Sequence, residues 1–267
     1  MSDPISPLIN ALHNQGRLRV WSLVITAFGD LVQDRGGEIS TARLGALLGR
    51  VGIEQGTLRT ALSRLNRDGW VTSTRSGRLS LYRLSEQGLD RFAPATTQIY
   101  AAPQTKPVSR WAMTLNISPD GAQQIELTPA DASSPPADLR LTGAIDTISE
   151  SYRATLLGEG QRLALDGLRD DLDALQSARL ETDLDAAASR LLLIHRWRRI
   201  TLRYGDIAPE LMPADAPLKN PRLAVAEAYR RLAPAAEAWL DSGDGDLAPM
   251  PPADARLARR FGGLQEA

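Results

Sequence analysis

The sequence predicts a mixed α+β fold that is mostly helical, with a winged helix-turn-helix near its N-terminus. Three observations lead to this prediction. Residues 15–92 combine three helical patterns with a β-hairpin pattern, residues 111–145 hold three strand-like segments, and helical spacing of apolar residues dominates the chain after residue 147. We therefore expect a winged-helix unit at residues 1–95, a small α+β unit at 96–147 and a helical unit at 148–267.

The overall composition narrows the class of protein. Of the 267 residues, 43% are hydrophobic and 24% are charged, as in ordinary soluble globular proteins. No apolar run approaches the roughly 18 residues of a membrane span, and we expect no secretion signal, because the first residues lack the basic and apolar segments of one. The absence of cysteine excludes disulfides, thiolate metal sites and cysteine nucleophiles. We expect a cytoplasmic protein with no cofactor, no metal site and no membrane partner.

The N-terminal unit begins with a loose arm, because residues 1–14 contain two prolines. Apolar positions at helical spacing predict a first helix over residues 18–32. The hydroxyl of Ser40 can cap a second, short helix. A third helix is expected over residues 54–68, where it stops at Gly69.

A β-hairpin pattern follows the third helix. Residues 70–74 and 78–84 are strand-like and flank Ser76-Gly77, a two-residue turn. Gly88 and Pro94 are expected to close the unit.

The remaining elements follow from the same rules. Strands are expected at residues 111–117, 123–127 and 139–145, with a flexible loop at 130–136. Helical patterns cover residues 156–180, 185–204 and 225–240, and the last helix is short. Four prolines between residues 209 and 221 indicate an irregular connection.

The third helix has the two faces that a DNA-recognition helix needs. Leu58, Ala61, Leu62 and Leu65 share one side and are expected in the core. Arginines and hydroxyl residues, which can bind base edges and phosphates, occupy the rest of the helix and the hairpin tip. The expected DNA-binding residues are Gln55, Thr57, Arg59, Thr60, Ser63, Arg64, Arg67, Arg75 and Arg78.

The charge distribution favours DNA binding only weakly. Residues 15–92 hold 12 arginines against seven acidic residues, an excess of +5, so that the rest of a chain with net charge −1 carries −6. A basic unit on an acidic body is typical of DNA-binding proteins. A chance fluctuation of surface charge is the alternative explanation.

Several motifs together resemble the PaaX family of transcriptional repressors. In the N-terminal unit these are residues 22–30 (SLVITAFGD), 35–39 (RGGEI), 57–65 (TLRTALSRL), Gly69-Trp70, Gly77-Arg78 and 82–84 (YRL). In the C-terminal unit they are residues 195–199 (HRWRR), 211–215 (LMPAD) and 228–232 (AYRRL). The resemblance implies a winged helix, a ferredoxin-like middle domain and a helical C-terminal domain. It also implies a homodimeric repressor of a phenylacetate-type aromatic catabolic operon, released from DNA by an aryl-acyl-CoA, typically phenylacetyl-CoA.

The sequence departs from the family pattern at two places. The middle segment is short, and Pro119-Asp120-Gly121 stands where the family usually has a helix and a longer αβ stretch. Asp215-Ala216-Pro217 replaces the family's Asp-Trp-Pro, so that a pocket for an aryl group would lose an aromatic side chain.

Candidate ligand-binding residues lie on the helix expected over residues 185–204. His195, Arg199 and Arg203 share one face, and Arg198 lies beside them. Arginines suit the phosphates of a CoA ligand. The alternative is a structural cluster paired with acidic residues, namely Asp206, Asp215 and Glu227. The separate acidic group Asp170, Asp171 and Asp173 is expected to be solvated, because adjacent helix positions point in different directions.

A ligand-responsive, DNA-binding repressor is therefore the leading functional hypothesis. A protein-interaction adaptor that uses its winged helix for docking is the alternative. An enzyme that acts on an acyl-CoA through His195 is a third hypothesis, but no catalytic motif supports it, and we expect no enzymatic activity.

Overall fold

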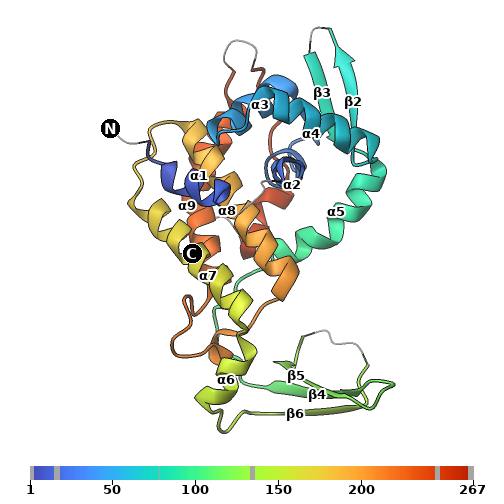
Figure 1. The fold of residues 1–267 in the computed structure, drawn as a ribbon, viewed down its shortest axis with the longest axis vertical. Coiled ribbons are helices and arrows are strands. Elements are labelled where there is room, and N and C mark those ends of the chain that lie inside the picture. Colours follow the sequence, from blue (N-terminus) through green and yellow to red (C-terminus); the bar gives the residue numbers. More distant parts are fainter. Residues whose placement is uncertain (1–2, 15–18, 78, 133–135, 244–246, 264–267) are drawn as a thin grey trace.

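The structure is a computed structural model that describes residues 3–14, 19–77, 79–132, 136–243 and 247–263. It confirms the mixed, mostly helical α+β class (Figure 1). The N-terminal part contains, in order, α1 (Ser6–His13), α2 (Val20–Ala27), the π-helical turn η1 (Phe28–Val32), β1 (Glu38–Ser40), α3 (Thr41–Arg50), α4 (Gln55–Arg67), β2 (Val71–Ser76), β3 (Leu79–Leu84) and α5 (Glu86–Ile99).

The three predicted helices and the hairpin are confirmed in this part of the chain. Ser40 caps α3, because its Oγ accepts a hydrogen bond from the backbone N–H of Arg43. Strands β2 and β3 pair in antiparallel fashion, and β1 adds to the free edge of β3 in the order β1-β3-β2. Strand β1 was not predicted, because three residues are too few for a periodic signal.

Two N-terminal predictions are wrong. Residues 1–14 were expected to be a loose arm, but α1 forms there because Leu8 and Leu12 are buried in the core. Gly88 and Pro94 do not end the unit, because α5 runs through both. A Cβ atom at Gly88 would lie 2.2 Å from the carbonyl oxygen of Trp70, so this glycine permits α5 to approach the backbone just before β2 closely.

The predicted strands of the middle segment form a separate antiparallel sheet. β4 (Trp111–Ile117) lies between β5 (Gln123–Pro129) and β6 (Leu139–Gly143). In Figure 1 this sheet lies at the opposite end of the molecule from α3 and α4. No helix occurs in the described residues from Trp111 to Gly143, so the sheet is not covered by helices of its own segment.

The C-terminal part is helical, as predicted. Its elements are α6 (Glu150–Leu156), α7 (Glu159–Ser177), α8 (Asp183–Tyr204), η2 (Pro209–Leu211), α9 (Pro221–Asp241), α10 (Ala255–Ala258) and η3 (Arg260–Gly262). Thr182 and Asp185 form a capping box that starts α8. Helix α9 begins earlier than expected, at Pro221, since proline fits the first turn of a helix and Asn220 caps it.

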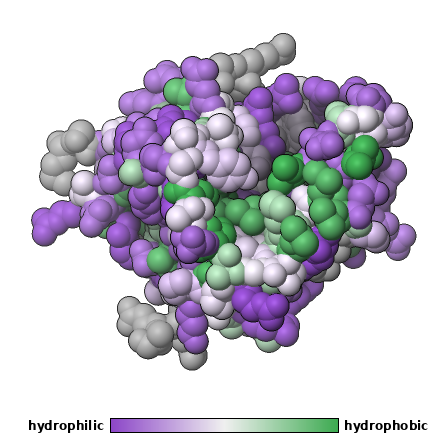
Figure 2. Space-filling view, turned by 90° about the horizontal axis from the view of Figure 1, so that it is seen from below, coloured by the Kyte–Doolittle hydropathy of each residue, from purple (hydrophilic) through white to green (hydrophobic). Residues whose placement is uncertain are grey.

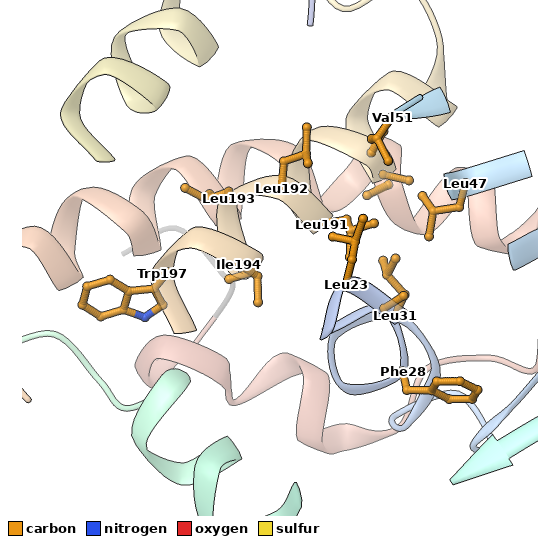
Figure 3. Close-up of a cluster of buried hydrophobic side chains, with 14 of the residues drawn as sticks. Leu23, Phe28, Leu31, Leu47, Val51, Leu191, Leu192, Leu193, Ile194 and Trp197 are labelled. Atoms are coloured by element: carbon orange, nitrogen blue, oxygen red, sulfur yellow. The ribbon is translucent and has the colours of Figure 1, made fainter. Parts of the chain in front are cut away.

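One hydrophobic core joins the two ends of the chain. Helix α8 packs against α9 and α7 and also against α2, α3 and α5. Figure 3 shows Leu191 of α8 beside Leu23 of α2, with Leu47 of α3 close by; all three side chains are buried. The N-terminal helices therefore do not form an independent core but share one with α8.

A buried carboxylate reinforces this shared core. The side chain of Asp30, in η1, is fully buried and accepts hydrogen bonds from Arg190 of α8 (3.0 Å) and Arg260 of η3 (2.8 Å). The hydroxyls of Tyr100 and Tyr229 also donate to it, at 2.7 and 3.1 Å. Burial raises the pKa of both tyrosines, which therefore stay protonated as donors.

We expect Asp30→Asn to lower the free energy of unfolding by about 3 kcal/mol, because it removes the buried carboxylate that Arg190 and Arg260 share and leaves them only Glu237 and Asp34 as acidic partners. Urea unfolding followed by circular dichroism measures this change. Asp170→Asn is a matched control at an exposed position, 69% exposed, with an expected change below about 0.5 kcal/mol. A loss below about 1 kcal/mol in Asp30→Asn would contradict the role of this network.

Candidate nucleic-acid interface and adjoining cleft

Helix α4 divides its residues as predicted between a buried and an exposed face. Leu58, Ala61, Leu62 and Leu65 are all buried. The candidate DNA-binding residues of the helix are all exposed, namely Gln55, Thr57, Arg59, Thr60, Ser63, Arg64 and Arg67. Arg64 and Arg67 make only long ion pairs with Asp68, at 3.4 and 3.3 Å, so they remain available to bind an anion.

The hairpin lies on the same side of the molecule as α4. In Figure 1, β2 and β3 project upward beside the end of α4, away from the β4–β6 sheet. Arg75 is exposed on β2, opposite Ser80 of β3. The candidate Arg78 at the tip lies outside the described residues. Helix and hairpin together present arginine and hydroxyl groups on one side.

Three N-terminal arginines that contribute to the charge excess are engaged inside the molecule instead. Arg43 is buried and donates to the carbonyl oxygens of Trp239, Ser242 and Ala248, at 2.6, 2.5 and 2.9 Å. Arg35 pairs with Glu237 and Asp241 of α9. Arg50 pairs with Asp3 and Asp185. The excess of +5 therefore overstates the charge available to DNA. The contacts of Arg43 and Arg50 hold α3 against α9 and α8.

A cleft of about 1380 Å³ lies between α4 and α8. Thr57, Thr60 and Arg64 of α4 line one side, and α8 lines another with His195, Arg199 and Arg203. The beginning of α2 supplies a third side, with Arg19, Val20, Trp21 and Ser22. The structure thus brings the predicted DNA-reading face and three predicted ligand residues into one cavity. We call it the α4–α8 cleft.

His195 contributes hydrogen bonds rather than charge to this cleft. It is only 4% exposed, and its Nδ1 lies 2.9 Å from Oγ1 of Thr26 in α2. Burial, together with the nearby positive charges of Arg198 and Arg199, lowers the pKa of His195 to about 3. The imidazole is therefore neutral near pH 7.

The fourth predicted ligand residue has a different position. Arg198 does not line the α4–α8 cleft; its guanidinium donates to the carbonyl oxygen of Ser22 and to Oγ1 of Thr26, at 3.1 and 3.0 Å. It joins α8 to α2. Together with the Thr26–His195 contact, this fixes the distance between two sides of the cleft.

Most acidic residues considered as partners of the α8 arginines are engaged elsewhere. Asp206 pairs with Arg222, and Asp215 pairs with Arg162. The expectation that the acidic group on α7 is solvated is wrong for Asp171, which is buried and paired with Arg196, although Asp170 and Asp173 are exposed. The sequence holds no local signal for this pair, because α7 and α8 meet only in the folded chain.

Comparisons with known proteins identify the family. A family model described as PaaX-like protein matches residues 19–88, and a model described as PaaX-like protein C-terminal domain matches residues 160–242. The chain is also 29% identical to the transcriptional repressor PaaX of Escherichia coli (strain K12) over 284 residues, covering 91% of this chain and 90% of that protein. The chain belongs to the PaaX family. Helix α4 lies in the first matched segment and α8 in the second, so the cleft is formed between them.

The low pKa of His195 predicts a pH-dependent stability. In the unfolded chain the imidazole binds a proton below about pH 6.5, whereas in the folded chain it does so only near pH 3. Protonation thus favours the unfolded state as the pH falls from 6.5 towards 3. Between pH 7.5 and pH 5, His195 should lower the free energy of unfolding by roughly 2 kcal/mol.

Urea unfolding of the wild type and His195→Gln at both pH values measures this contribution. The variant should lose less stability on acidification than the wild type, by that amount. His13→Gln, at an exposed position, is the control and should retain the wild-type difference. Equal acid sensitivity of wild type and His195→Gln would show that His195 is not a buried neutral imidazole.

Proposed function

We propose that this chain is a cytoplasmic transcriptional repressor that binds double-stranded operator DNA. The exposed face of α4 beside the β2–β3 hairpin, in the segment that matches the family, is the observation that carries the proposal. The Escherichia coli relative is named a transcriptional repressor, which agrees with the expectation that this chain has no enzymatic role. We infer that α2, α3 and α4 with the hairpin act as a winged helix-turn-helix.

In this proposal α4 enters the major groove. Arg64 is the central reading residue, because its guanidinium can bind guanine O6 and N7 in a bidentate manner. Thr57 and Thr60 reach bases or phosphates, and Arg75 on the hairpin binds the backbone. The apolar face of α4 anchors the helix, so that contacts with DNA do not depend on a mobile segment.

We propose that an aryl-acyl-CoA, such as phenylacetyl-CoA, is the effector, and that it binds in the α4–α8 cleft. A CoA thioester needs a large site and positive charges for its phosphates. The cleft offers about 1380 Å³ and is lined by four arginines, namely Arg19, Arg64, Arg199 and Arg203. A second cavity near Trp197 and Arg222 offers only about 180 Å³, which is too small for such a ligand.

We further propose that the repressor is a homodimer formed through the β4–β6 sheet. The register places large apolar side chains on one face, and Met113, Ile117, Ile125, Leu139 and Leu141 are 39–58% exposed. Figure 2, which views the molecule from the sheet end, shows hydrophobic side chains gathered on this surface. In a two-fold dimer the same surface patch of each subunit forms the interface, so the patch must be complementary to itself. An apolar sheet face meets this requirement, because it can pack against the same face of a second copy of the chain.

Arg64→Ala tests the reading face. We expect it to weaken binding to a specific DNA duplex by about 1–3 kcal/mol, since one bidentate base contact is lost. Fluorescence anisotropy with a duplex selected from a random pool measures the change, and Arg169→Ala, on α7, is the exposed-arginine control. Wild-type affinity in Arg64→Ala would place the reading face elsewhere.

The same assay separates a repressor from an adaptor. DNA binding through phosphates weakens steeply with salt, whereas an adaptor would show no duplex binding and a salt-insensitive protein partner.

Substitution of the apolar sheet face tests the dimer. We expect Ile125→Lys combined with Leu141→Lys to convert the dimer into a folded monomer, because opposed charges of like sign would be buried in the interface. Light scattering after size-exclusion chromatography measures the mass. Leu163→Lys, at a 65% exposed position on α7, is the control and should remain dimeric. A dimeric double variant would exclude this face as the interface.

A further inference from the structure

We propose that the anionic effector and operator DNA compete directly for the same residues, so that the α4–α8 cleft is one site used by two polyanions in turn. The inference rests on the proposed function and adds how it is regulated. The observation behind it is that the face of α4 exposed for DNA is also one side of the cleft. Thr57, Thr60 and Arg64 are predicted DNA contacts and cleft-lining residues at once.

The cleft has the chemical character of a site for an anion with an apolar end. Arg199 and Arg203 of α8 line the same cleft as Arg64 of α4, so phosphates bound in it would meet positive charge from both helices. Leu12 of α1 and Val20 and Trp21 of α2 also line the cleft and supply an apolar surface for an acyl group.

His195 adds a neutral polar group to the wall of the cleft. It is 4% exposed and lines the cleft, while its Nδ1 faces Thr26. Its neutral imidazole can exchange a hydrogen bond with a ligand group or water bound in the cleft.

The packing around the cleft disfavours a release mechanism in which α4 swings away from α8. Helix α3 is held on α9 by buried Arg43, and α2 is held on α8 by Arg198 and His195. Helix α4 packs against both α2 and α3. Because these helices share one core, a ligand in the cleft meets α4 in the position it has here and covers Arg64 instead of moving it.

A titration distinguishes competition from an allosteric effect. Anisotropy gives the Kd for the selected duplex at rising concentrations of phenylacetyl-CoA, with CoA as the probe that lacks the aryl group. Direct competition predicts that the apparent Kd rises in proportion to the ligand concentration without a limit. A plateau means that protein, duplex and ligand form a ternary complex, which would overturn the inference.

Three variants assign the shared and separate residues, with ligand affinity measured by calorimetry. Arg64→Ala should weaken binding of both duplex and phenylacetyl-CoA by about ten-fold or more. Arg75→Ala, on the hairpin, should weaken the duplex alone, and Arg203→Ala should chiefly weaken the ligand. Unchanged ligand affinity in Arg64→Ala would refute a shared site.

The outcomes also separate this inference from the proposed function. If the duplex binds and neither CoA probe does, the shared site is refuted and the DNA-binding repressor stands. If no duplex is selected or bound, both fail.

Discussion

The carboxylate of Asp30, enclosed by Arg190 and Arg260, is the interaction on which the arrangement of the molecule depends. Charges removed from water are tolerated only when partners are in place, and here the partners come from opposite ends of the chain. The π-helical turn at Phe28–Val32 follows α2 directly and contains Asp30, whose carboxylate contacts Arg190 of α8 there. The N-terminal helices and α8 are thus fixed to each other before any ligand or DNA is considered.

This constraint also shapes the cleft. Helix α2 lies between α4 and α8 (Figure 1) and packs against both, so that it sets their separation. Arg198 and His195 then fasten α2 to α8 through Thr26. An opening between rigid helices of one core can bind a ligand without reorganising, which keeps the entropic cost of binding low. The proposed DNA-binding surface and the proposed effector site therefore share one helix because of how the core is packed.

The sequence was sufficient to predict the helices and strands that have strong local signals. Helix α4, the β2–β3 hairpin, the three strands of the middle sheet and α8 were predicted from periodicity and turn residues. The passage of α5 through Pro94 and the burial of Asp171 were missed, because distant contacts outweigh local preference at those positions. The candidate residues were individually identifiable from the sequence. Their meeting in one cleft was not, since Arg64 and Arg203 are joined only by the folded core.

The shared core has an evolutionary consequence. Recombination can join a DNA-binding module to a new sensory module when each module has its own core. Here such an exchange would separate Asp30 from Arg190 and Arg260 and would leave buried charges on both sides of the junction. Relatives of this chain should therefore acquire new DNA and ligand specificities by substitutions on the surface of α4 and in the cleft. The N-terminal and C-terminal parts of the chain should be inherited together.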